Sequence, residues 1–260
     1  MNTRRNFMRG LSGIGAIVAT GHAPAIVKSM IAARGTMLGG AHGWRNPYIT
    51  DGLIAMWDGE WNAGGGVHDP NATVWKDLVG NNDLPLTQSS NLYFDEKSLV
   101  AKNGVYAGFS RNDYPVDLVD FTFEVCWSRD TLFSVEADSS NKFGLLTADV
   151  FKGKIFVKAN TINRVDYTPV GVSQGDRFAI SFSGKYNGDS RDIIAYLNNR
   201  QLVGGVTMPG NYSASQLRIG SGWNNPSSHH FNVRIYSRAL TAYEIAANYA
   251  VNKKRFNLAS

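Results

Sequence analysis

Large apolar side chains alternate with small or polar ones through most of the chain between Asp51 and Ile235. The run over 121–128 shows this alternation most plainly, since every second residue is Phe, Phe, Val or Trp. Because successive side chains of a strand point to opposite faces, such a run predicts a strand with one apolar face. The same period recurs at Phe178, Ile180 and Phe182, at Ile193, Ala195 and Leu197, at Leu217 and Ile219, and at Phe231, Val233 and Ile235.

Clusters of Gly, Asn, Asp and Ser separate these runs, for example GNND, KYNGDS and GSGWNNPSS. Asn198 and Asn199 stand between two such runs, and asparagine tolerates the positive φ that a tight hairpin needs. Many short strands with turn signals, without alternating helices, are typical of an antiparallel sandwich. The pattern therefore predicts an all-β fold.

The C-terminal region departs from this period. Thr241 and Glu244 form the pattern of a capping box, in which each side chain satisfies an amide at the start of a helix. Ile245 and Tyr249 lie four residues apart, as expected for one apolar stripe on a helix. We therefore expect one short helix that packs on the sheet after the last strand.

The N-terminal segment, residues 1–25, has the order of an export signal: a cationic start, an apolar run and small residues. Its Arg4-Arg5 pair resembles the twin-arginine export signal, and Ala23-Pro24-Ala25 resembles a cleavage site after Ala25. The alternative is an amphipathic helix that packs on the protein. The apolar run is shorter than the ~20 residues that span a bilayer, so we expect no membrane span in the mature chain. These features predict an exported protein in the periplasm or outside the cell, with residues 26–50 as a connector.

Composition narrows the function classes. The net charge is +5, but three arginines belong to the N-terminal segment, and no basic stripe with interleaved aromatic residues follows. Nucleic acid is therefore not an expected partner. Cys126 is the one cysteine of the 260 residues, so the chain forms no internal disulfide.

Two long stretches carry a resemblance to a known family. VRIYSRALTAYEIAANYAVNKKRF and DGLIAMWDGEWN followed by TVWKDLVGNND resemble the closing and opening signatures of bacterial laminin G-type domains of the concanavalin A-like lectin/glucanase superfamily. The resemblance covers 51–256 and implies a jelly-roll β-sandwich. It also implies that Trp57 and Trp75 face the core and that Asp77 builds a turn with Gly80-Asn81.

A loop at 221–230 has the composition of a sugar site. Glycans bind to an aromatic ring together with amides and other polar groups on loops held by a rigid sheet. The candidate carbohydrate-binding residues are Trp223, Asn224, Asn225, His229 and His230. The alternative for Trp223 is that its ring covers the edge of the sandwich.

Calcium is a second possibility for the loops, because Asp58, Asp69, Asn71 and Asp83 supply the oxygen ligands that this ion prefers. Their alternative role is to cap backbone amides in turns. His68, His229 and His230 could suggest zinc or copper, but they lack a third partner at ligand spacing. We therefore expect them to be exposed loop residues.

A glycoside hydrolase is the least favoured function. Asp58 and Glu60 share a strand face, but Glu136-Ala137-Asp138 is followed by Asn141 where hydrolases of this fold carry a further carboxylate. The sequence favours an exported, non-catalytic carbohydrate-binding domain whose partner is a glycan or polysaccharide. The alternative is a structural or adhesive module that binds assembly proteins of a cell surface or a phage particle.

Overall fold

The computed structural model describes residues 44–86, 90–102, 106–108, 119–128, 133–137, 145–151, 154–159, 163–167, 176–202, 206–209, 214–220 and 227–258. All of them belong to one compact unit, Thr36–Ser260. The predicted export signal with Arg4, Arg5 and Ala25, and the loop residues Trp223, Asn224 and Asn225, lie outside these ranges. None of the described helices is of the length and apolarity that a bilayer crossing requires.

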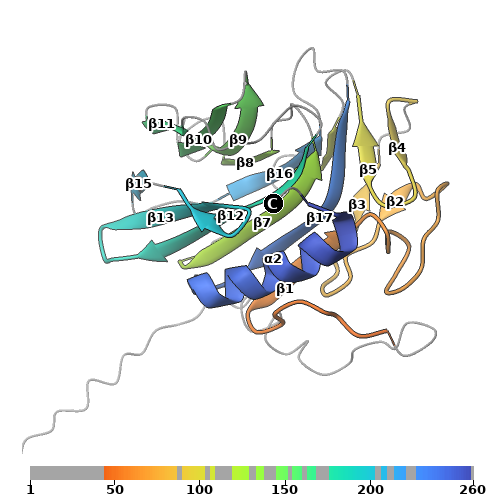
Figure 1. Ribbon diagram of the computed structural model, residues 1–260, viewed down its shortest axis with the longest axis horizontal. Helices are drawn as coiled ribbons and strands as arrows, with labels where there is room; N and C mark the ends of the chain where they lie inside the picture. The colour runs from red at the N-terminus through yellow and green to blue at the C-terminus, as the bar shows by residue number, and fades with distance from the viewer. Residues whose placement is uncertain are drawn as a thin grey trace, which may run out of the picture. The chain divides into compact units, whose positions relative to one another are not determined.

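The described residues form an antiparallel β-sandwich with one C-terminal helix, as predicted (Figure 1). The strands are β1 (Leu53–Asp58), β2 (Val74–Trp75), β3 (Leu84–Pro85), β4 (Leu92–Phe94), β5 (Leu99–Ala101), β6 (Tyr106–Gly108), β7 (Phe121–Ser128), β8 (Phe133–Ala137), β9 (Leu145–Phe151), β10 (Lys154–Ala159), β11 (Asn163–Tyr167), β12 (Arg177–Tyr186), β13 (Ser190–Leu197), β14 (Arg200–Gln201), β15 (Val206–Pro209), β16 (Ala214–Gly220) and β17 (Ser228–Tyr236).

Two sheets contain most of these strands. Among the described residues, nine strands form the larger sheet in the order β14-β13-β12-β7-β17-β5-β4, with β1 also pairing with β17 and β15 with β13. Six strands form the second sheet in the order β11-β10-β9-β8-β16-β6, and β2 pairs with β3 separately. The two central strands of the larger sheet, β7 and β17, are more than 90 residues apart in sequence. The sheet is therefore built from long-range pairings.

The apolar face predicted from the alternation forms the main core. Phe121, Phe123, Val125 and Trp127 are all almost fully buried, together with Phe178, Ile180 and Phe182 of β12 and Ile219 of β16. Trp57 and Trp75 are fully buried in the same core, as the family resemblance implied. Their indole N–H groups donate to the carbonyls of Asn82 and Asp58, each at 2.9 Å, which satisfies both buried donors.

The turn predicted at Asp77 is confirmed. Asp77 Oδ1 accepts from the amides of Met56 and Val79, and Oδ2 accepts from the amide and side chain of Asn82. A Cβ at Gly80 would lie 2.7 Å from Asp77 Oδ2, so glycine is required there. The Asn198-Asn199 hairpin is also confirmed, with φ of 46° and 64°.

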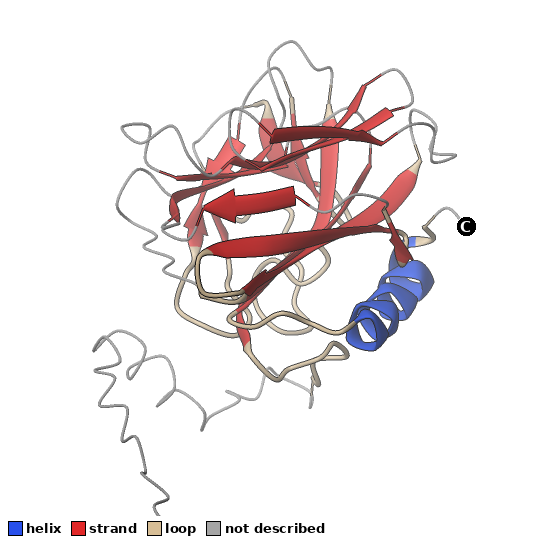
Figure 2. Cartoon of the chain, turned by 90° about the vertical axis from the view of Figure 1, so that its left-hand side faces the viewer, coloured by secondary structure: helices blue, strands red, loops and turns tan. Residues whose placement is uncertain are grey.

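The helix α2 (Ala242–Phe256) begins with the predicted capping box. The Thr241 hydroxyl accepts from the amide of Glu244 at 3.3 Å, and the Glu244 carboxylate accepts from the amide of Thr241 at 2.9 Å. Arg238 also binds this carboxylate, and these hydrogen bonds lower the pKa of Glu244 to about 2. The helix lies against a face of the larger sheet (Figure 2), so Thr122, Glu124 and Cys126 are buried as well.

The period of two predicted the wrong face for one residue of β17, Phe231. Val233 and Ile235 of β17 enter the main core, but Phe231 lies on the opposite face, with Cys126 and Phe256. The cause is a shift of register between His230 and Asn232 where β17 pairs with β7. Such a bulge adds one residue and reverses the orientation of those that precede it.

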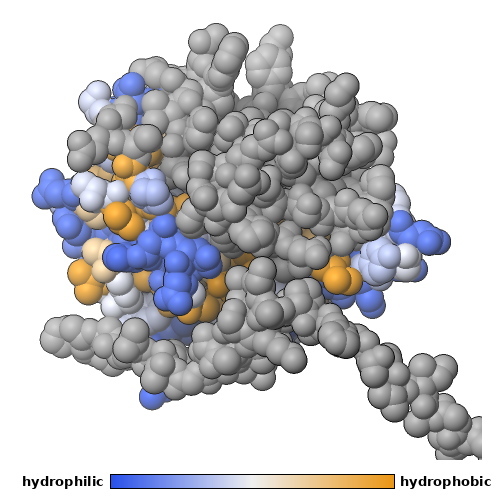
Figure 3. Space-filling model, turned by 180° about the vertical axis from the view of Figure 1, so that it is seen from behind, coloured by the Kyte–Doolittle hydropathy of each residue, from blue (hydrophilic) through white to orange (hydrophobic). Residues whose placement is uncertain are grey.

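The surface seen from behind mixes hydrophilic and hydrophobic residues in its coloured part (Figure 3). The exposed large apolar side chains of the described residues come from separate elements, such as Val119 before β7 and Tyr243 on α2. Scattered exposed apolar residues are ordinary on a protein surface. These side chains therefore do not indicate an apolar binding surface on the described part of the chain.

A candidate ligand-binding groove

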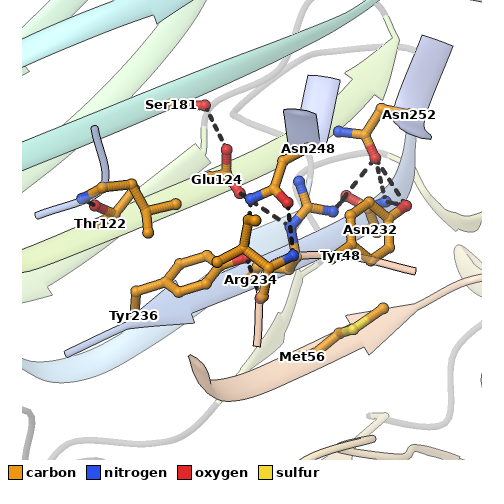
Figure 4. Close-up of polar contacts among 12 residues, drawn as sticks. Tyr48, Met56, Thr122, Glu124, Ser181, Asn232, Arg234, Tyr236, Asn248 and Asn252 are labelled. Atoms are coloured by element: carbon orange, nitrogen blue, oxygen red, sulfur yellow. Dashed lines mark hydrogen bonds and ion pairs between the residues drawn. The ribbon is translucent and has the colours of Figure 1, made fainter. Parts of the chain in front are cut away.

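Polar side chains fill the space between α2 and the larger sheet (Figure 4). Glu124 of β7 accepts hydrogen bonds from Ser181 Oγ at 3.0 Å, Arg234 Nε at 3.0 Å and Asn248 Nδ2 at 2.7 Å. Asn252 Oδ1 accepts from the Tyr48 hydroxyl at 2.8 Å, and all these groups are buried. We call this set, which also includes Asn232, the covered network. Tyr48 belongs to the segment expected to be a connector, so that segment contributes to the packed domain.

Arg255 of α2 extends the covered network to β1. Its guanidinium donates to both carboxylate oxygens of Asp58, at 2.7 and 2.9 Å, and to Glu60 at 2.8 Å. It also lies 3.5 Å from the centre of the Trp61 ring. Burial disfavours the charged form, but these carboxylates hold the pKa of Arg255 above its ordinary value. The two carboxylates weighed for hydrolysis are therefore both engaged by one arginine.

The other calcium candidates have roles in turns and ion pairs. Asp69 Oδ1 accepts from the amide of Asn71 at 2.8 Å, and Asp83 accepts from the amide of Asp77 and pairs with Lys76 at 2.5 Å. Within the described ranges, no group of three or more His, Cys, Asp or Glu residues is placed to hold a metal ion. The structure thus does not bring Asp58, Asp69 and Asp83 together.

The same sheet face continues past the C-terminal end of α2 and becomes the floor of a groove of about 620 Å³. Arg177 of β12 pairs with Ser128 of β7, and Ser128 pairs with His229 of β17. Residues paired across antiparallel strands lie side by side on one face, so these three form a row. The lining residues are Asp95, Glu96, Lys97, Ser128, Arg177, Ser227, His229, Phe231, Arg255 and Asn257.

The turn between β4 and β5 forms one wall. Asp95 Oδ1 accepts from the amides of Lys97 at 2.9 Å and Ser98 at 2.7 Å, which holds this turn together. Gly59, directly after β1, packs against it, and a Cβ there would lie 2.5 Å from the Lys97 carbonyl oxygen and from Ser98 Cα. Glycine at this position therefore allows the turn to approach β1 and to stand beside β17.

The turn also orients His229. The imidazole Nδ1 lies 3.0 Å from Asp95 Oδ2 and 3.0 Å from Ser98 Oγ. Partial burial opposes ionisation of Asp95, but hydrogen bonds from His229, Lys97 and Ser98 lower its pKa to about 2. An ionised carboxylate only accepts, so Nδ1 carries the proton that is donated to it. The Nε2 atom is then left as a hydrogen-bonding group with no partner among the described residues.

His229 and His230, both predicted to lie in a loop and to bind a glycan, differ in their exposure. Both belong to strand β17 and not to a loop, which corrects the expectation from the sequence. His229 is partly exposed and lines the groove, whereas His230 is fully buried and contacts Ser228 Oγ at 3.1 Å. His230 therefore cannot touch a bound glycan, because alternation along β17 turns it toward the core. His68 contacts the carbonyl of Gly59 at 3.0 Å.

Sequence reasoning missed most of the groove. Of its lining residues only His229 was a candidate, and Ser227 directly follows 221–226, the part of the predicted loop that lies outside the described residues. Arg177, Ser128 and Asp95 are separated by 33 to 82 positions in the numbering and carry no local motif. Only the strand register brings them together.

Comparison with known proteins gives the fold. No protein-family model matches the chain, and no curated protein matches it in sequence. The solved structure of a Trypanosoma rangeli sialidase in complex with sialic acid is similar, with a TM-score of 0.55 at 15% identity over 89% of this chain and 39% of that chain.

Two binding domains of botulinum neurotoxins are similar to the same degree. The type G receptor-binding domain has a TM-score of 0.53 at 11% identity, over 78% of this chain and 52% of that chain. The serotype D binding domain has a TM-score of 0.55 at 12% identity, over 79% and 53%. The chain thus spans between about two fifths and one half of these neighbours. At such identities the likeness concerns the fold alone, and this chain shares their β-sandwich architecture.

Proposed function

We propose that this protein is a non-catalytic carbohydrate-binding β-sandwich and that its groove is the glycan site. The row of Arg177, Ser128 and His229 carries the proposal, because it presents polar groups on a rigid sheet beside an open volume. Sugar hydroxyls are bound by such convergent polar groups. The similar solved structures support this interpretation, since one is a sialidase in complex with sialic acid, one is a receptor-binding domain and one is a binding domain of a neurotoxin.

The state of the carboxylates supports binding without catalysis. Glycoside hydrolysis needs a general acid with a raised pKa that faces a second carboxylate across the substrate. In the groove, the pKa of Asp95 is lowered to about 2, and both of its oxygens are engaged by the β4–β5 turn and His229. Burial raises the pKa of Asp58, but Arg255 binds both of its oxygens and also pairs with Glu60, so Asp58 does not face a substrate. These carboxylates suit structural roles better than acid–base roles.

Export is part of the proposal and rests on the N-terminal pattern alone. The mass of the protein isolated from its own cells tests it directly. A chain that begins at Ile26 supports export, and an intact Met1 contradicts cleavage after Ala25.

A glycan array probed with the full chain, with and without calcium, tests the proposed function. Binding to at least one glycan is expected, and His229→Ala should lower that affinity about five- to tenfold through the loss of one hydrogen bond. Asp189→Ala is the matched control, because Asp189 is exposed beyond the other end of β12. If the chain binds no glycan, the proposal is wrong, and a structural or adhesive module remains as the alternative function. Undiminished binding by His229→Ala would move the site elsewhere.

A further inference from the structure

We propose that the groove selects glycans that carry an anionic substituent, a carboxylate or a sulfate, and that Arg177 binds this group. The inference rests on the proposed function and adds the chemical class of the ligand. Its basis is the position of Arg177, which lines the groove without the carboxylate partner that Arg234, Arg238 and Arg255 have.

Arg177 is held in place without a counter-charge. Its Nη1 donates to the carbonyl of Phe256 at 3.1 Å, and its guanidinium lies over the ring of Phe231 at 5.0 Å from the ring centre. These two contacts fix the plane of the guanidinium before a ligand arrives. A ligand that binds to Arg177 therefore loses less affinity to the ordering of this side chain. No described residue forms an ion pair with it. The Nε and Nη2 donors therefore remain for a bound molecule.

Other arginines on this side of the sheet behave differently. Arg234 pairs with Glu124, Arg238 with Glu244, and Arg255 with Asp58 and Glu60. Arg234 bonds Glu124 through Nε alone, whereas in Arg238 and Arg255 a carboxylate of the same chain binds two nitrogens, the fork of the guanidinium. Arg177 offers the same fork to the groove, and carboxylate and sulfate oxygens match that geometry with two parallel hydrogen bonds.

The rest of the lining is compatible with an anion. Ser128 stands next to Arg177 in the row and supplies a hydroxyl donor, and Lys97 on the wall supplies a second positive charge. The two acidic residues of the wall differ: Asp95 is already engaged by the turn and His229, whereas Glu96 is exposed. Arg255 supplies no free positive charge, because Asp58 and Glu60 both pair with it and the three groups together carry a formal charge of −1.

A purely structural role for Arg177 is the competing explanation. Its bond to the Phe256 carbonyl satisfies one acceptor at the end of α2, as basic side chains often do there. That role uses one nitrogen and predicts no preference among ligands. The charge of the ligand therefore separates the two explanations.

The experiment compares acidic glycans with their uncharged forms. The full chain is applied to an array of uronate-, sialate- and sulfate-bearing glycans printed beside neutral ones. The best acidic ligand is then measured by calorimetry against its carboxyl methyl ester or its desulfated form. We expect the acidic form to bind about ten- to a hundredfold more tightly, which is the value of hydrogen bonds to a charged group.

Variants then assign the preference to Arg177. Arg177→Gln should make the acidic and the uncharged forms bind equally. Arg177→Lys keeps the charge but loses the fork of two nitrogens, so its preference for the acidic form should lie between that of the unmodified protein and that of Arg177→Gln. Lys185→Gln is the matched control, since Lys185 is an exposed cation on the same face of β12, eight residues away. Circular dichroism and thermal unfolding of each variant confirm folding.

The outcomes separate the two proposals. Equal binding of the acidic and uncharged forms, or binding of neutral glycans only, overturns the anionic class and leaves glycan binding intact. A preference for acid that survives Arg177→Gln in a folded protein overturns the role of Arg177. Binding to no glycan overturns both.

Discussion

One face of the larger sheet carries polar residues in two settings. Under α2, Glu124 and Arg234 are buried and bonded to each other and to asparagines of the helix. Past the end of α2, Ser128 and His229 stand on the same two strands, β7 and β17, but line an open groove. Both pairs consist of polar residues on the same face of the same two strands. They differ in that α2 covers the first pair and not the second. A buried polar group must find its partner within the protein, whereas an uncovered one keeps bonds for a ligand.

The covered network should respond most strongly to mutation. Arg234→Met leaves Glu124 as a buried carboxylate without its counter-charge, so we expect the free energy of unfolding to fall by about 3–5 kcal/mol in urea denaturation. The double variant Glu124→Gln with Arg234→Met should recover part of this loss. A loss below about 1 kcal/mol would show that the covered network is not a stabilising unit.

Gly59 connects β1 to the wall of the groove, and its replacement should affect both settings. In Gly59→Ala the new Cβ lies 2.5 Å from backbone atoms of the β4–β5 turn, so the turn must shift. We expect a loss of about 1–3 kcal/mol in stability, as for other overpacked sites, together with weaker glycan binding. Retention of full affinity in calorimetry would mean that the turn does not shape the site.

The cap of α2 should contribute less. Glu244→Ala removes the reciprocal half of the capping box, and we expect a loss of about 1 kcal/mol at neutral pH. The folded pKa of Glu244 is about 2, below its ordinary 4.5, so its contribution is present above pH 4.5 and is lost as the pH falls toward 2. Unfolding curves of the two proteins should therefore converge in acid, and a constant difference would contradict this assignment.

Asp95 should show the smallest effect on stability. Its folded pKa of about 2 lies below its ordinary 3.8, so its contribution is complete above pH 4 and disappears as the pH falls through this interval. The group is half-exposed, and solvent screening limits the expected loss in Asp95→Asn to below about 1 kcal/mol. The carboxyl signal of Asp95 in an NMR titration should move near pH 2. A midpoint near 4 would remove the argument that this turn fixes the tautomer of His229.

Local pattern was sufficient for much of the fold. The alternation over 121–128 identified a strand and its apolar face, Thr241 and Glu244 identified the start of α2, and Asn198-Asn199 identified a hairpin. Each of these depends on neighbours in sequence. The same reasoning placed Phe231 on the wrong face and His230 in a loop, because a bulge in β17 is set by its pairing with β7.

The sequence by itself determined which segments are strands and where the helix begins, since side-chain period and capping act over a few residues. Tertiary structure decided which polar residues meet. Arg177, Ser128 and His229 share a row only through the register of β12, β7 and β17. The same register places Arg234 opposite Glu124 and Arg177 opposite Ser128, and α2 covers Arg234 but ends beside Arg177. Pairing over long separations and the reach of a helix are properties of the folded chain, and they separate the structural arginine from the one proposed to bind a ligand.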